Sequence, residues 1–105
     1  MAIYQGDQYS IPFNIRHNGE IVTPDTVDDV VIAIGDIVRA YSDGTLTYVD
    51  GKWLFPIYKE ETLKMPDSIS YQVQIHYGAD IIHSKEYPIK QKTILESLKA
   101  RLQND

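Results

Sequence analysis

The sequence predicts an all-β fold, an immunoglobulin-like antiparallel β-sandwich of about seven strands with a short C-terminal helix. Three observations predict it. Short runs with period-two alternation of apolar and polar residues fill the chain from residue 9 to residue 90. Asn-Gly and Asp-Gly pairs, which tolerate the positive φ values of tight hairpins, separate several of these runs. The even spacing of the runs favours an antiparallel sandwich or barrel over a sheet of βαβ units.

The first strand is expected over residues 9–16, because Ile11, Phe13 and Ile15 alternate with Pro12 and polar residues. An Asn-Gly pair follows this strand at once. It is predicted to turn the chain into a short hairpin arm.

An acidic segment that starts at Pro24 is expected to form a loop or a single helical turn. It leads into residues 30–34, which are apolar at nearly every position. Such a run is typical of a central strand that is covered by the core on one face and partly covered on the other. Gly35-Asp36 is expected to end or bulge this strand.

Residues 37–42 and 45–49 flank Asp43-Gly44 and are predicted to form a tight hairpin. Another Asp-Gly turn leads into the strand over residues 53–57. Pro56 has no N–H to donate to a ladder, so this strand is expected to lie at an edge or to end there.

The segment 58–65 is predicted to be a helical turn inside the sheet region, closed by Pro66. The clearest strand follows over residues 68–77. Its alternation places on one face Ile69, Tyr71, Val73, Ile75 and Tyr77.

The partner of that strand, residues 81–90, is less regular. Ile82 and Tyr87 cannot share a face in an unbroken strand, because their positions differ by an odd number. A bulge near Ser84-Lys85 would resolve this conflict, and other registers are open as alternatives.

A chain of 105 residues is one domain. We expect a sandwich over residues 1–90 and a helical tail over residues 91–105. The inward-facing strand positions predict a core of Ile11, Phe13, Ile15, Val30, Ile32, Ile34, Leu46, Leu54, Tyr71, Val73 and Ile75.

The hydrophobic period changes to that of a helix near the C-terminus. Thr93 is the expected N-cap, with Glu96 three residues later. Leu95, Leu98 and Leu102 lie at i, i+3 and i+7 and form one apolar stripe, which is the candidate interface. A helix this short is marginal alone, so it must dock on its own sandwich or on another copy.

Charge and composition exclude several classes of protein. The net charge is −5, but residues 90–105 carry about +2 and the body therefore −7. An acidic body disfavours nucleic-acid binding, which needs concentrated Lys and Arg. Cysteine is absent, which excludes disulfides, thiolate metal sites and a nucleophilic thiol. No apolar run approaches the roughly 20 residues that span a bilayer, and the N-terminus lacks a signal-peptide pattern, so no membrane partner is expected.

No catalytic, cofactor or metal site is predicted. His76 and His83 would share a face of one hairpin if its loop has two residues, but with His17 they show no zinc-ligand spacing. The acidic group Asp25, Asp28 and Asp29 lacks the pattern of a calcium loop. Adjacent Glu60 and Glu61 diverge on a helical turn. We therefore expect a protein that is not an enzyme and has no small-molecule substrate.

The order of these segments resembles small virion proteins of siphophages and prophages of Gram-positive bacteria. The resemblance covers most of residues 3–90, and its layout is similar to the immunoglobulin-like N-terminal domain of the upper baseplate protein. It is carried by Gly6-Asp7-Gln8-Tyr9-Ser10-Ile11-Pro12-Phe13, Trp53-Leu54-Phe55-Pro56-Ile57, Glu60-Glu61-Thr62-Leu63 and Ser70-Tyr71-Gln72-Val73-Gln74-Ile75.

What the resemblance implies is a non-enzymatic part of a phage tail or baseplate that acts by docking on other virion proteins or on itself. Such a protein is made in the bacterial host cytoplasm without a signal peptide and ends in the virion. Here one short helix stands in place of a long coiled coil, which leaves the role of a smaller adaptor, decoration or tail-associated protein.

A second function stays open, that of a small carbohydrate- or ligand-binding sandwich. Tyr48, Trp53 and Tyr58 would then form an aromatic platform for sugar faces. Tryptophan in such a fold is more often a core residue. The exposure of Trp53 decides between the two readings.

Overall fold

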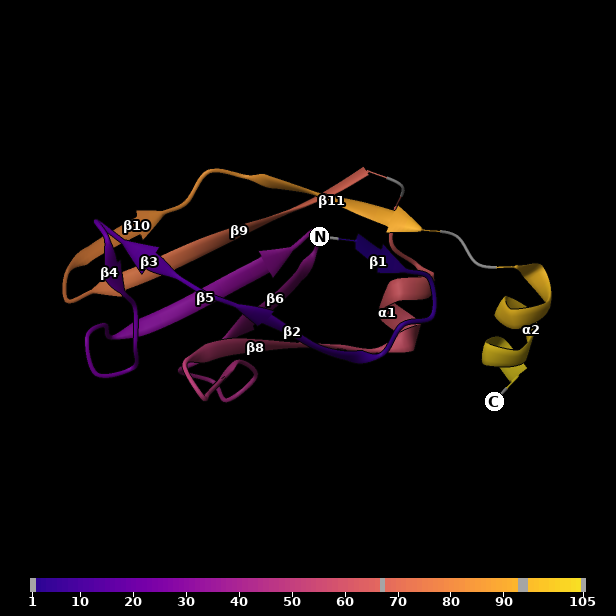
Figure 1. Cartoon of the computed structure of the whole chain (residues 1–105), viewed down its shortest axis with the longest axis horizontal. Helices are drawn as coiled ribbons and strands as arrows, with labels where there is room; N and C mark the ends of the chain where they lie inside the picture. The colour runs from indigo at the N-terminus through magenta and orange to yellow at the C-terminus, as the bar shows by residue number, and fades with distance from the viewer. Residues whose placement is uncertain (1, 67, 93–94, 105) are drawn as a thin grey trace.

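The computed structural model describes residues 2–66, 68–92 and 95–104, in which the strands gather into two sheets that face each other (Figure 1). The larger sheet has the order β1 (Ala2–Tyr4), β11 (Tyr87–Lys92), β9 (Ser68–Tyr77), β5 (Asp29–Ile34) and β6 (Ile37–Ala40), with β10 (Asp80–His83) also paired to β9. The smaller sheet has the order β2 (Tyr9–Phe13), β8 (Lys52–Ile57) and β7 (Thr47–Val49). A separate hairpin joins β3 (Arg16–His17) to β4 (Glu20–Ile21), and the helices are α1 (Lys59–Leu63) and α2 (Glu96–Asn104).

The all-β class and the C-terminal helix are confirmed. The order β11-β9-β5-β6 opposite β2-β8-β7 corresponds to strands G, F, C and C′ opposite B, E and D of an immunoglobulin-like sandwich. The described residues hold eleven strands where about seven were expected. The excess arises because the predicted runs 9–16 and 81–90 each divide in two, and because β1 and β4 are added.

Two of the predicted turns form as expected. Asn18 and Gly19 have φ values of 52° and 82°, and Asp50 and Gly51 have 51° and 79°. Positive φ at both central residues belongs to the type I′ turn, whose twist matches that of the flanking strands. These turns connect β3 to β4 and β7 to β8.

The predicted hairpin around Asp43-Gly44 is wrong. β6 pairs instead with β5 across the two-residue loop Gly35-Asp36, and β7 pairs with β8. Asp43-Gly44 lies where the chain crosses from one sheet to the other, and the Thr45 N–H donates to the Asp43 carboxylate at 3.0 Å. Gly35 suits its tight loop because its φ is +56° and a Cβ there would lie 2.8 Å from Ile69 Cδ1.

The sequence did not reveal β1. Ile3 is fully buried, and β1 pairs in parallel with β11, so that Ala2 lies opposite Lys90 and Tyr4 opposite Lys92. A run of three residues is too short to show a period of two. This parallel pair is the one departure from an antiparallel arrangement among the described strands.

The predicted bulge near Ser84 is confirmed. β10 pairs His83 with Gln74, and β11 pairs Tyr87 with Tyr71. Three residues on one strand therefore face two on β9. Ser84 fills the gap, since its N–H donates to the Val73 carbonyl at 2.9 Å and its hydroxyl oxygen accepts from the Val73 N–H at 3.0 Å.

Pro56 lies in the middle strand of the smaller sheet, at a point where that strand has one neighbour. It faces Ser10 of β2, whereas β7 pairs only with residues 52–54. The missing N–H of Pro56 is thus tolerated, and β8 ends one residue later. The predicted helical turn is also confirmed as α1, where Glu61 accepts the Tyr58 N–H at 3.0 Å.

Most of the predicted core is buried between the two sheets, with Leu54 and Tyr71 only half-buried. Tyr71 still packs edge-on against Phe13, with ring centroids 5.1 Å apart. The core also contains residues that were not among the predicted core positions: Ile3, Val22, Trp53, Phe55, Ile57, Met65, Ile69 and Ile89.

Candidate functional site

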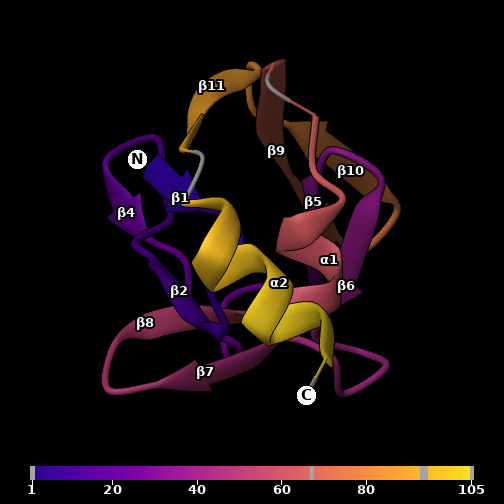
Figure 2. The same ribbon diagram turned by 90° about the vertical axis from the view of Figure 1, so that its right-hand side faces the viewer.

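Helix α2 stands off one end of the sandwich (Figures 1 and 2). Leu95, at its entry, is 73% exposed and Leu98 is 53% exposed, while Leu102 is half-buried. Among the described residues no hydrogen bond or ion pair joins α2 to the sandwich. The predicted leucine stripe is therefore formed and largely uncovered.

The start of α2 differs from the expectation. The helix begins at Glu96, and the carbonyl of Leu95 accepts the N–H groups of Leu98 at 3.0 Å and Lys99 at 3.1 Å. The predicted cap, Thr93, lies outside the described residues. At 3.6 residues per turn, Lys99 and Arg101 flank the stripe on its two sides. The exposed leucines thus carry a basic border.

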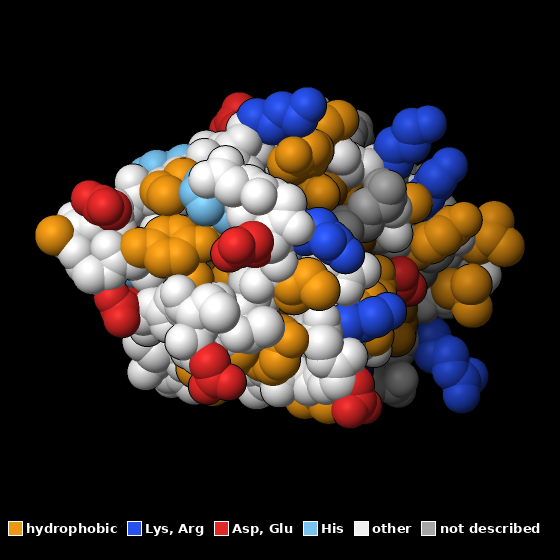
Figure 3. All heavy atoms as spheres, turned by 60° about the vertical axis from the view of Figure 1, so that its left-hand side comes forward, with side chains coloured by type: hydrophobic (Ala, Val, Ile, Leu, Met, Phe, Trp, Pro, Cys, Tyr) orange, Lys and Arg blue, Asp and Glu red, His pale blue; other side chains and the backbone are white. Residues whose placement is uncertain are grey.

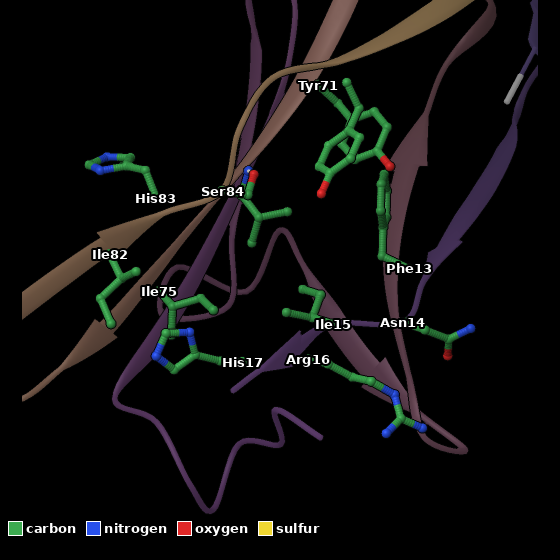
Figure 4. Close-up of a pocket in the computed structure, with 12 residues that line it drawn as sticks. Phe13, Asn14, Ile15, Arg16, His17, Tyr71, Ile75, Ile82, His83 and Ser84 are labelled. Atoms are coloured by element: carbon green, nitrogen blue, oxygen red, sulfur yellow. The ribbon is translucent and has the colours of Figure 1, made fainter. Parts of the chain in front are cut away.

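The sandwich opens between the edge strand β2 and the bulged pair β10 and β11. A cavity of about 190 Å³ lies in this opening. Its apolar wall is formed by Phe13, Ile15, Tyr71, Val73, Ile75 and Ile82 (Figure 4).

Aromatic rings close one end of this cavity. Tyr71 stacks on Tyr87 with centroids 5.1 Å apart. Burial raises the pKa of the Tyr71 phenol, and the nearby Tyr87 raises it further. Both effects disfavour a phenolate at Tyr71, so the ring lines the cavity as a neutral group.

A shallower hollow continues from the cavity towards the β9–β10 hairpin. It shares His17 and Ile82 with the cavity and is bordered by Glu20 and Asp80. We call the cavity and this hollow together the apolar groove. The groove was not predicted from the sequence, although the conflict between Ile82 and Tyr87 was a signal that the sheet is interrupted here.

The histidines do not form a metal site. His76 and His83 lie on the same face, as predicted for a two-residue loop, and Gln74 lies between them at 2.8 Å from each ring. His17, on β3, lies against Tyr77, with the ring centroids 5.7 Å apart. In the part of the chain that the structure describes, no three His, Asp or Glu side chains are grouped to hold a metal ion.

Two residues of the acidic segment that leads into β5 accept hydrogen bonds from other parts of the chain. Asp28 accepts the Gly78 N–H, and Asp29 accepts both the N–H and the hydroxyl of Ser42. Asp25 is exposed on the surface. Glu61 binds Arg39 at 2.7 Å, which ties α1 to β6, whereas its neighbour Glu60 is exposed.

The aromatic platform does not form. Trp53 is 0% exposed and donates its indole N–H to the Val22 carbonyl at 3.0 Å. Tyr48 packs edge-on against Trp53, whereas Tyr58 lies apart, at the start of α1 beneath Arg39. A sugar cannot stack on a ring in the core, so the ligand-binding reading loses its central residue.

No helix among the described residues has the length and apolar character needed to cross a bilayer. Comparisons of the chain with protein-family models, curated proteins and solved structures gave no match.

Proposed function

We propose that the chain is a non-enzymatic structural module of a phage or prophage particle, a tail, baseplate or adaptor component that acts by docking on protein. The observation that carries the docking role is the leucine stripe of α2, a helix that stands off the sandwich with Leu95 and Leu98 exposed. A helix of nine residues is marginal in water, so a contact must supply most of its stability.

The placement in a phage particle is supported by the resemblance of residues 3–90 to small virion proteins and by the immunoglobulin-like strand order. Function on this fold depends on its surfaces, because the same sandwich supports many roles. The described surface offers an apolar helix and an apolar groove, and these suit a protein partner.

The test is incorporation into particles. Particles purified from an induced host are expected to contain the chain by mass spectrometry. Leu98→Glu is expected to be lost from particles, because it places a charge at the centre of the contact. Ala100→Glu is the matched control, since Ala100 lies on the opposite side of the helix.

Two results contradict the proposal. One is a wild-type chain that is absent from purified particles. The other is a Leu98→Glu chain that is incorporated as well as Ala100→Glu.

A further inference from the structure

We infer that α2 of one copy docks in the apolar groove of a second copy, so that the chain associates head to tail. This inference rests on the proposed function and names the partner of the α2 stripe. Helix α2 lies at one end of the molecule, and the hollow of the groove lies beside β3, β4 and β10 at the other end (Figure 1).

The leucine stripe and the groove match in shape and polarity. The groove has an apolar floor that includes Ile75 and Ile82, and its cavity holds about 190 Å³. A dry cavity of roughly 150 Å³ admits a molecule the size of benzene. The cavity can therefore receive a leucine side chain such as Leu98, in the manner of an amphipathic helix in a groove.

The charges beside the two surfaces are opposite. Lys99 and Arg101 border the leucine stripe, whereas Glu20 and Asp80 border the hollow that extends the groove. In Figure 3 acidic side chains are spread over the left and lower parts of the visible face, and most basic ones lie in its upper and right parts. Opposite charges at the two ends favour the docking of one end on the other and oppose the pairing of like ends.

The stripe is too far from Ile82 of its own chain to cover it. The five steps of β11 from Lys92 back to Tyr87 span about 17 Å, and the four steps along β9 from Tyr71 to Ile75, the partner of Ile82, add about 13 Å. In the other direction the backbone from Lys92 to Leu102 reaches at most about 23 Å, with four extended steps to Glu96 and the rise of the helix beyond it. The Ile82 end of the groove is therefore left for another copy.

Such an interface is heterologous, because two different surfaces meet. Association of the wild-type protein should increase with its concentration. It should continue beyond a dimer unless the copies close into a ring. Sedimentation velocity and light scattering are expected to show this. Leu98→Glu and Ile82→Glu should each weaken self-association about thirty-fold or more.

Matched controls exist for both surfaces. Ala100→Glu changes the far side of α2, and Ile81→Glu changes the outer face of β10, where Ile81 is 54% exposed. Both are expected to associate like the wild type. Circular dichroism and melting curves of all four variants separate a lost interface from a lost fold.

A mixing experiment is decisive. Leu98→Glu keeps an intact groove, and Ile82→Glu keeps an intact helix, so an equimolar mixture should form one heterodimer that grows no further. If Ile82→Glu associates like the wild type while Leu98→Glu does not, helices pair with helices and the inference is wrong. If the wild type stays monomeric at every concentration, self-association is overturned, and incorporation into particles still decides the proposed function separately.

Discussion

Trp53 Nε1 donates to the Val22 carbonyl at 3.0 Å, although the two residues are 31 positions apart in the chain. Both side chains are at most 2% exposed. This bond fastens the segment that follows the β3–β4 hairpin to β8, the middle strand of the smaller sheet. A buried indole N–H needs such a partner, so the bond explains why a tryptophan is tolerated here.

Trp53→Phe should destabilise the sandwich by about 2–4 kcal/mol, because it empties core volume and leaves the Val22 carbonyl unpaired. Urea denaturation, monitored by circular dichroism, measures the loss of unfolding free energy. Tyr58→Phe is the control, since Tyr58 is 48% exposed and its change should stay within about 0.5 kcal/mol. Equal effects of the two changes would contradict the assigned role of the bond.

The fluorescence of Trp53, the only tryptophan, tests the ligand-binding alternative. We expect blue-shifted emission that resists quenching by acrylamide, because the indole is buried. Adding oligosaccharides should leave the spectrum unchanged. A saturable change in emission with any sugar would restore a binding function.

Val73→Asp is expected to unfold the protein. Val73 is 7% exposed, and an unpaired buried carboxylate costs several kcal/mol against a domain stability of roughly 5–15 kcal/mol. Val38→Asp is the matched control on β6, where the side chain is 56% exposed. Thermal melts of both variants check the difference, and a folded Val73→Asp would show that the core is misplaced.

Removal of metal ions should leave the melting temperature unchanged. Among the described residues no three His, Asp or Glu side chains are grouped to hold a metal ion, and His76 and Asp29 are hydrogen-bonded to Gln74 and Ser42. Dialysis against a chelator, followed by a melt, measures this. A drop of several degrees that one divalent ion reverses would contradict the prediction.

The ionised Asp43 carboxylate makes the stability of the fold depend on pH. The Thr45 hydroxyl and N–H donate to its carboxylate and lower its pKa below the ordinary value of 3.8. A lowered pKa in the folded state means that the stabilisation is present above about pH 4 and is lost as the pH falls through the folded pKa. The difference in melting temperature between wild type and Asp43→Asn should therefore narrow below about pH 4. A constant difference down to pH 2 would exclude this cause.

The strands with strong alternation of apolar and polar residues were predictable from the sequence. The points where the chain crosses from one sheet to the other were not. Ser68–Tyr77 alternates over ten residues, so the pattern showed which side chains of this strand point inward. It also indicated that the strand paired with it is bulged. Asp43-Gly44 has the composition of a hairpin turn, yet its neighbours pair with other strands. Local turn chemistry cannot distinguish a hairpin from a crossing between sheets, because the choice depends on distant partners.

The site was predictable in part for the same reason. The leucine stripe depends only on spacing along one helix, and so the sequence showed it. The groove is made by side chains from β2, β9, β10 and β11, which meet only in the folded sandwich. The burial of Trp53 likewise depends on a carbonyl from a distant segment.

The parallel pairing of β1 with β11 has a mechanical consequence. Ala2 lies beside Lys90 and Tyr4 beside Lys92, so a pull on the two ends of the chain in opposite directions drags these strands past each other. All the hydrogen bonds between them then resist at the same time, whereas a hairpin pulled open at its ends loses its bonds one after another. A sandwich built in this way can carry tension along its length without unravelling from one end.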